Sequence, residues 1–128
     1  MKICITSMGE DINAEVDPRF GRCKYFLIVD TETMDAESVS NEGISSSGGA
    51  GIQAAQMVAK TGAVTVITGN IGPNAFQTLT AAGIKVITGV NGNINQVVAK
   101  FKKGELKEIK SPSVGSHFGM GGRTGRNL

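Results

Sequence analysis

Two arginines and a cysteine stand close together in a short basic segment of the chain. Arg19 and Arg22 flank Phe20 and Gly21, and Cys23 follows directly. Guanidinium groups suit the recognition of anions. A nearby cation also favours the thiolate of a cysteine, which is a soft metal ligand. The segment therefore indicates a site for an anion or a soft metal, and the alternative is two solvated arginines beside a small buried residue.

Three glycine-containing turns, at 45–51, 69–74 and 89–93, each precede a predicted helix. The first turn of a helix carries unpaired N–H groups and a partial positive charge, which attract anions. Glycine in addition lets a ligand approach the backbone closely. The residues that we assign to a binding site are Arg19, Phe20, Gly21 and Arg22 from the basic segment and Gly48, Gly49, Gly51, Gly69, Asn70, Gly72 and Asn74 from the first two turns. Ordinary turn and capping chemistry is the alternative for each turn.

The stretch from Val64 to Phe76 organises the predicted sheet. Val64 to Ile67 is apolar and β-branched, as expected of a buried strand, and Pro73 suits the first turn of a helix. The sequence Val-Ile-Thr-Gly at 66–69 returns at 86–89, which indicates two successive strand–turn–helix units. Such units form adjacent parallel strands, and their turns gather at the carboxyl edge of the sheet. We therefore expect the three turns to share one pocket.

The hydrophobic pattern predicts an α/β fold with a mixed five-stranded sheet. Predicted strands span 2–7, 24–30, 36–41, 64–67 and 84–88, and helices that begin at 50, 73 and 94 are stopped by Gly62, Gly83 and Gly104. The first three strands form an antiparallel meander, and parallel βα units follow it, with helices on the faces of the sheet. Residues 1–110 form one domain, and we expect the Gly-rich residues 111–128 to be a flexible tail.

Composition excludes several classes of function. The chain has 128 residues, a formal charge of +2, two cysteines without a CxxC pair and a single histidine, His117. The mild charge argues against nucleic-acid binding. The sequence shows neither a run of about 20 apolar residues nor a signal peptide, so nothing in it indicates a membrane or secreted protein. We therefore expect a cytoplasmic protein. Catalytic triads, GxGxxG and Walker motifs are missing, so we also expect that it is not an enzyme. His117 and, more weakly, Met120 are further candidate soft-metal ligands.

Several motifs together resemble a known family. They are Asp17-Pro-Arg-Phe-Gly-Arg-Cys-Lys-Tyr-Phe26, Gly48-Gly-Ala-Gly51, Gly69-Asn-Ile-Gly-Pro-Asn-Ala-Phe76, Ala82-Gly-Ile-Lys-Val86 and Phe101-Lys-Lys-Gly-Glu-Leu106. Because these motifs stand in the order expected of the family, the chain resembles the nitrogenase iron–molybdenum cofactor biosynthesis family, of the NifX/NafY and NifB C-terminal type, over residues 1–117.

The resemblance implies an RNase H-like fold and a non-catalytic role. Members of the family carry or insert iron–sulfur or molybdenum–iron–sulfur clusters, so cluster donor and acceptor proteins are the implied partners of a monomer or weak homodimer. Such clusters are usually anionic, which agrees with arginines and helix N-termini. Cys23 and His117 are the candidate metal ligands, and His117 corresponds to a C-terminal histidine of the family.

Two other functions use the same glycine turns. A phosphate- or nucleotide-binding sensor needs the same backbone N–H groups at helix starts. A protein-interaction module docks on a partner through the tail after Lys110. Thermal shifts with ATP and with thiomolybdate distinguish the sensor from the cluster carrier.

Overall fold

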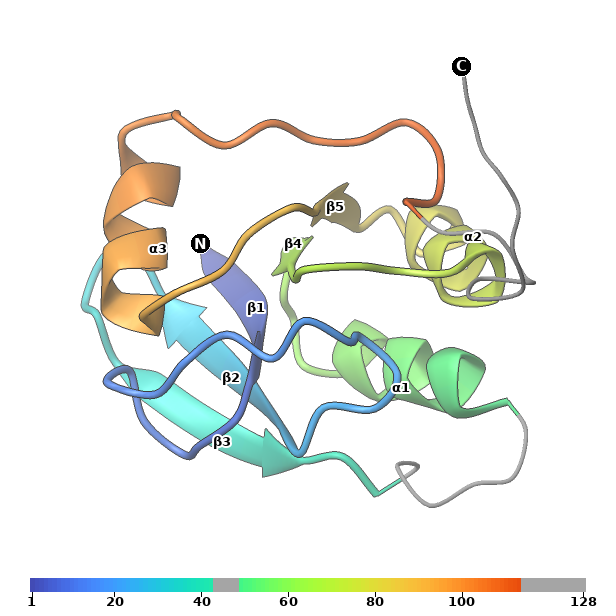
Figure 1. Cartoon of the computed structure of the whole chain (residues 1–128), viewed down its shortest axis with the longest axis horizontal. Helices are drawn as coiled ribbons and strands as arrows, with labels where there is room; N and C mark the ends of the chain where they lie inside the picture. Colours follow the sequence, from blue (N-terminus) through green and yellow to red (C-terminus); the bar gives the residue numbers. More distant parts are fainter. Residues whose placement is uncertain (43–48, 114–128) are drawn as a thin grey trace.

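The computed structural model describes residues 1–42 and 49–113. Within these ranges the chain forms an α/β fold with five strands and three helices (Figure 1). In chain order the elements are β1 (Lys2–Ser7), β2 (Tyr25–Asp30), β3 (Ala36–Ser40), α1 (Ala50–Ala59), β4 (Thr65–Ile67), α2 (Pro73–Ala81), β5 (Lys85–Ile87) and α3 (Ile94–Lys102). No helix in the described part of the chain is long and apolar enough to cross a membrane.

The strands form one mixed sheet in the order β3-β2-β1-β4-β5. The pairs β1–β2 and β2–β3 are antiparallel, and the pairs β1–β4 and β4–β5 are parallel. The predicted meander followed by parallel units is therefore confirmed, and so is the mixed five-stranded sheet. The RNase H-like assignment stays a prediction.

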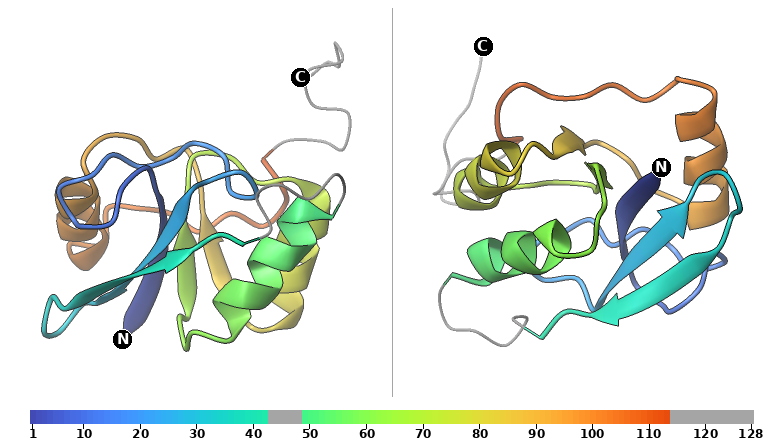
Figure 2. Two further views of the ribbon diagram at one scale, coloured as in Figure 1. Left: turned by 90° about the horizontal axis from the view of Figure 1, so that it is seen from below. Right: turned by 180° about the vertical axis from the view of Figure 1, so that it is seen from behind.

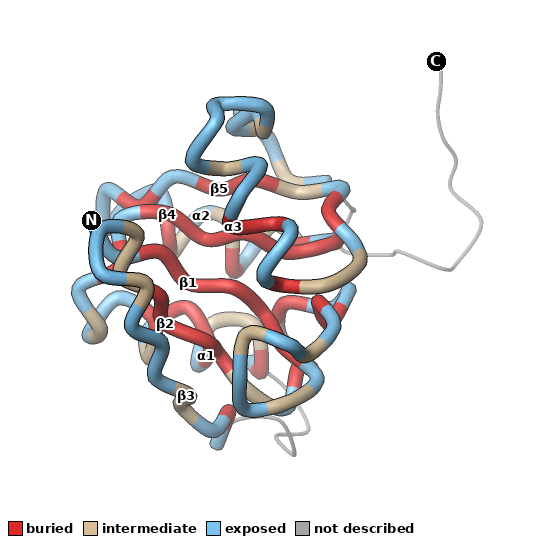
Figure 3. The backbone as a smooth tube through the Cα atoms, turned by 90° about the vertical axis from the view of Figure 1, so that its left-hand side faces the viewer, coloured by how far each residue is buried: buried red, intermediate tan, exposed pale blue. Residues whose placement is uncertain are grey.

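Helices cover both faces of the sheet, and alternation along the central strand β1 decides which side chain meets which helix (Figures 1 and 2). Ile3 and Ile5 point to the face covered by α3, and Cys4 points to the face covered by α1 and α2. Successive side chains of a strand alternate between its two faces, so β1 is covered by helices on both faces. Figure 3 shows β1 buried along its course, whereas the edge strand β3 is largely exposed.

The local signals for helix ends are confirmed. Pro73 occupies the first turn of α2. Gly62, Gly83 and Gly104, which follow the three helices, have φ angles of 87°, 79° and 73°. L-residues adopt this left-handed region at a cost that glycine avoids. The strand boundary at Val64 differs from the prediction, because β4 begins at Thr65 and Val64 is 45% exposed.

The chain after α3 returns along the sheet toward the start of α2 (Figure 1). The Ile109 N–H donates to the Val86 carbonyl at 2.8 Å, and Glu108 forms an isolated bridge with Ile87 of the edge strand β5. Ser113 then pairs with Ile71: its hydroxyl accepts from the Ile71 N–H at 2.8 Å, and its own N–H donates to the Ile71 carbonyl at 3.1 Å. The described chain thus ends beside the turn that leads into α2.

Candidate functional site

An open cavity of about 590 Å³ lies where the loop after β1 meets the starts of α1 and α2. Its lining comes from three segments that are distant in the sequence. They are Arg19–Arg22 of the loop, Gly49–Ile52 at the start of α1, and Asn70–Ala75 at the start of α2. The volume falls within the range of small-molecule sites. Two of the three predicted turns therefore meet the basic segment at one cavity.

Hydrogen bonds fasten the loop to the turn after β4. The Asn70 N–H donates to the Pro18 carbonyl at 2.8 Å, and the Phe20 N–H donates to the Asn70 carbonyl at 3.2 Å. Gly69 makes this approach possible, since a Cβ placed there would lie 2.7 Å from the Pro18 Cα. Gly69 does not line the cavity, and its role is to let two backbones come together.

Small residues also bring the three segments together at the base of the cavity. A Cβ added to Gly21 would lie 3.1 Å from the Gly51 Cα, and a Cβ added to Gly51 would lie 3.3 Å from the Ala75 Cβ. These distances are tighter than ordinary contact, so larger residues would push the loop and the two helices apart. The glycines thus place Arg19 and Arg22 next to two helix N-termini.

Both helices present uncapped first turns to the cavity. Neither Gly49 before α1 nor Gly72 before α2 supplies a side-chain cap. The first-turn amides of a helix have no acceptor within the helix, and Pro73 has no N–H at all. The amides that remain belong to Asn74 and Ala75 in α2 and to the first turn of α1, whose residues all line the cavity. Two partial positive charges therefore meet there.

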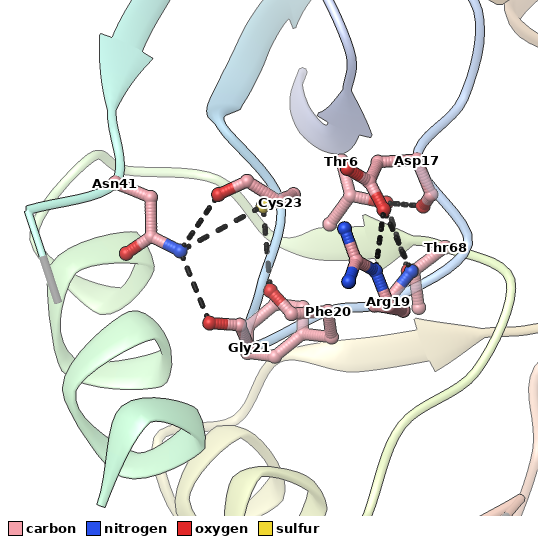
Figure 4. Close-up of polar contacts among 8 residues, drawn as sticks. All are labelled: Thr6, Asp17, Arg19, Phe20, Gly21, Cys23, Asn41 and Thr68. Carbon is pink, nitrogen blue, oxygen red and sulfur yellow. Dashed lines mark hydrogen bonds and ion pairs between the residues drawn. The ribbon is translucent and has the colours of Figure 1, made fainter. Parts of the chain in front are cut away.

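A buried carboxylate lies behind Arg19 (Figure 4). The Asp17 side chain is only 3% exposed, whereas that of Arg19 is 65% exposed. Asp17 Oδ1 accepts the Arg19 N–H at 3.0 Å and lies 3.6 Å from Arg19 Nε. Asp17 was not among the residues assigned to the site, although an acidic residue two positions before an arginine is a signal for such a turn.

The third predicted turn does not join the cavity, so the prediction of one pocket for three turns is wrong. Residues 89–93 lead into α3 on the other face of the sheet, where α3 packs on Ile3 and Ile5. The loop after β1 closes this turn, since the Ile94 N–H donates to the Ala14 carbonyl at 3.0 Å and the Asn95 N–H to the Ile12 carbonyl at 3.0 Å. Main-chain carbonyls there take the place that an anion would need.

Cys23 is buried below the basic segment and does not line the cavity. Its Sγ lies 3.3 Å from the Phe20 carbonyl, and the Asn41 side chain donates to the Cys23 carbonyl at 2.9 Å (Figure 4). Burial, and secondarily the charge of Asp17, raise the pKa of the Cys23 thiol to about 12. The prediction that nearby cations favour its thiolate is therefore wrong, because desolvation opposes the charged form.

Burial also raises the pKa of the Cys4 thiol well above its usual value. Gly48, His117 and Met120 lie outside the described residues. Within residues 1–42 and 49–113, no group of three or more His, Cys, Asp and Glu side chains could hold a metal ion. The described wall of the cavity therefore offers N–H groups, guanidinium groups and apolar surface to a guest.

The cavity includes residues that the sequence analysis did not assign to it. They are Ala50, Ile52, Ile71, Pro73 and Ala75. Ala50, Ile71 and Pro73 lie inside the two predicted turns, between the residues that were assigned, and Ile52 and Ala75 follow those turns by one residue. Phe20 and Ile71 are themselves buried, so they contribute a packed apolar base.

A family model described as dinitrogenase iron–molybdenum cofactor matches residues 1–104. The chain belongs to the dinitrogenase iron–molybdenum cofactor family. The predicted resemblance is thus confirmed, and the matched range contains the whole described wall of the cavity.

The chain is similar to two solved structures and to one further protein known by its sequence. The apo form of the orange protein from Desulfovibrio gigas is 45% identical, with a TM-score of 0.85, over 88% of this chain and 95% of that one. A NifB-like protein from Thermotoga is 36% identical, with a TM-score of 0.75, over 86% and 94%. An uncharacterised protein of Methanocaldococcus jannaschii is 30% identical over 77% of this chain and 86% of its own length.

Proposed function

We propose that the protein binds an anionic iron–sulfur or molybdenum–iron–sulfur cluster, or its precursor, and carries it during metallocofactor assembly. The observation that carries this proposal is the convergence of Arg19, Arg22 and the uncapped starts of α1 and α2 on one open cavity. The proposal assigns the protein a binding role without catalysis.

The chemistry of the cavity suits a large, sulfide-rich anion. Guanidinium groups and backbone N–H groups donate hydrogen bonds to an anion, and donors at a charged acceptor bind more strongly than neutral pairs. Ile52, over a base formed by the buried Phe20 and Ile71, adds apolar surface, which suits the weakly hydrated faces of a bulky cluster. An open cavity also allows the guest to leave, which a carrier requires.

The family relationship supports the same proposal. The family is named for the iron–molybdenum cofactor of dinitrogenase. The 45% identical structure is called an orange protein and is described in its apo form, which agrees with a coloured group that the protein can lose. Cluster donor and acceptor proteins are the partners that this role requires.

His117 remains a candidate ligand on grounds of its place in the sequence. Ser113 is fixed to Ile71, which lines the cavity. His117 follows Ser113 by four residues in the sequence and lies outside the described residues. A His117→Ala variant that keeps its full metal content would remove His117 from the proposal.

The test is anaerobic reconstitution with iron, sulfide and molybdate, followed by visible spectroscopy and metal and sulfide analysis. We expect charge-transfer bands in the parent and a clear loss of bound metal in Arg19→Ala and Arg22→Ala. Lys110→Ala, which removes an equal charge outside the cavity, is the matched control and should keep the parent's content. A parent that stays colourless and free of metal under all conditions contradicts the proposal.

A second function is supported by the same amides, since helix starts also bind phosphate. Thermal shift separates the two functions. Stabilisation by tetrathiomolybdate and not by ATP supports the cluster carrier. Stabilisation by ATP alone supports a phosphate- or nucleotide-binding sensor.

A further inference from the structure

The buried carboxylate next to Arg19 suggests how the guanidinium group of Arg19 is oriented at the cavity. We propose that Asp17 is a positioning residue, whose buried carboxylate holds Arg19 so that the terminal nitrogens of its guanidinium face the cavity. The inference rests on the proposed function, because it assigns Asp17 a role in binding the same anion through Arg19.

Asp17 is itself fixed to the end of β1 through Thr6, which in turn contacts Thr68 after β4. Its N–H donates to the Thr6 carbonyl at 2.9 Å, and its own carbonyl accepts the Thr6 hydroxyl at 2.7 Å. The Thr6 hydroxyl also lies 2.8 Å from that of Thr68, which follows β4. These groups are buried, and buried, satisfied polar networks are rigid. The carboxylate thus projects from a fixed point at the ends of β1 and β4.

The carboxylate contacts Arg19 at two places. The Arg19 N–H donates to Oδ1 at 3.0 Å, and Nε lies 3.6 Å from the same oxygen, which is an ion-pair distance longer than a hydrogen bond. Figure 4 shows the Arg19 guanidinium beside the Asp17 carboxylate, with the ion pair drawn at Nε. An arginine on a loop otherwise samples many rotamers, and ordering it on binding would weaken affinity.

The same carboxylate opposes an anion by its own charge. A negative group near an anion site lowers affinity unless it improves the geometry of a cation by more. The inference therefore predicts a change of sign: loss of the Asp17 charge weakens anion binding when Arg19 is present and strengthens it when Arg19 is absent. A merely structural role has no reason to produce such a reversal.

The first test needs no anion. The ¹H–¹⁵N signal of Arg19 Nε is compared in the parent and in Asp17→Asn, which keeps the size of the side chain. We expect this signal to shift and its exchange with water to accelerate, while the backbone spectrum shows a folded protein. Asp11→Asn is the matched control, since Asp11 Oδ1 also accepts the N–H two residues later, from Asn13 at 2.9 Å, on an exposed loop. An unchanged Nε signal in Asp17→Asn overturns the inference.

The second test is a double-mutant cycle with tetrathiomolybdate as the probe, in which the dissociation constant is measured. We expect Asp17→Asn to bind about fivefold more weakly than the parent, the equivalent of about one hydrogen bond. In the Arg19→Ala background the same change should strengthen binding. Equal weakening in both backgrounds, or strengthening in both, overturns the inference.

Two further outcomes are separated by design. If the parent does not bind tetrathiomolybdate but the Nε signal responds to Asp17→Asn, the proposed function fails while Asp17 still positions Arg19. If Asp17→Asn does not fold, Arg19→Lys replaces it, because lysine keeps the charge and has no Nε edge for Asp17. Binding by Arg19→Lys as weak as by Arg19→Ala supports positioning, and binding as strong as in the parent overturns it.

Discussion

The turns before α2 and α3 both follow the sequence Val-Ile-Thr and begin with a glycine, and the fold uses the two turns in opposite ways. The turn at 69–74 leaves the first amides of α2 at an open cavity beside Arg19. The turn at 89–93 is closed: the Ala14 carbonyl accepts the Ile94 N–H, and the Asn95 N–H is shared by Asn93 Oδ1 at 2.9 Å and the Ile12 carbonyl at 3.0 Å.

One loop accounts for the difference. Its first half, at 12–16, lies against the start of α3, and its second half, at 18–22, borders the start of α2 (Figure 1). The first half supplies carbonyl acceptors, and the second half supplies guanidinium groups. A helix N-terminus is thus a binding element or a structural joint according to what the rest of the chain places before it.

The largest expected effect concerns the two glycines that end the repeated sequence. Gly69→Ala should lower the free energy of unfolding by about 3 kcal/mol, because its Cβ would overlap Pro18. Gly89→Ala should cost only about 1 kcal/mol, because space is free there and only its φ of 77° is unfavourable. Urea unfolding measures both. Equal losses would show that the close contact with Pro18 is unimportant.

Alkaline pH should destabilise the face that carries the cavity. Cys4 and Cys23 both lie on the side covered by α1 and α2. With the pKa of Cys23 at about 12 in the folded protein, the unfolded chain releases this proton first, so stability is complete below about pH 9 and falls as the pH rises toward 12. At pH 10.5 the loss from this thiol is about 2 kcal/mol.

Urea unfolding at a series of pH values measures this loss. Cys23→Ala is the control. The slope of its free energy of unfolding against pH should correspond to about one fewer proton released on unfolding than in the parent. An identical slope in the two proteins would show that the Cys23 thiol is not responsible.

Removal of the cap at the closed turn should have a smaller effect, on stability alone. Asn93→Ala deletes the side-chain cap, which is one of two acceptors of the Asn95 N–H, and should cost about 1 kcal/mol. The affinity for tetrathiomolybdate should stay the same, since Asn93 lies outside the cavity. Weaker binding in Asn93→Ala would contradict the division between the two turns.

The smallest expected effect is that of Cys23→Ser on anion binding. Cys23 is buried and protonated, and it does not line the cavity. The dissociation constant for tetrathiomolybdate should therefore change by less than about twofold, well below the loss of one hydrogen bond. A variant that loses most of its binding while it remains folded would restore Cys23 as a candidate ligand.

The sequence allowed prediction of whatever depends on local geometry. Pro73 at a helix start and Gly62, Gly83 and Gly104 after helix ends were predicted correctly, because backbone angles decide these positions. All five strands were predicted as well, with ends that differ from the structure by at most one residue, including the weak edge strand β3 with Val39 as its only large apolar residue.

The errors arose where distant segments decide the outcome. Closure of the 89–93 turn depends on carbonyls of Ile12 and Ala14, about 80 residues earlier in the sequence. The protonation of Cys23 depends on burial under the folded loop and on Asp17. The resemblance to a family supplied the functional proposal but did not distinguish the open turn from the closed one.

The most direct test of the account is a titration of ¹⁵N-labelled protein with tetrathiomolybdate, followed by backbone and Arg Nε signals. We predict that the signals of Gly51, Ile52, Asn74, Ala75 and Arg19 shift together with one dissociation constant, while those of Ile94 and Asn95 stay unchanged. Equal shifts at the start of α3, or shifts confined to residues far from the cavity, would contradict the central claim.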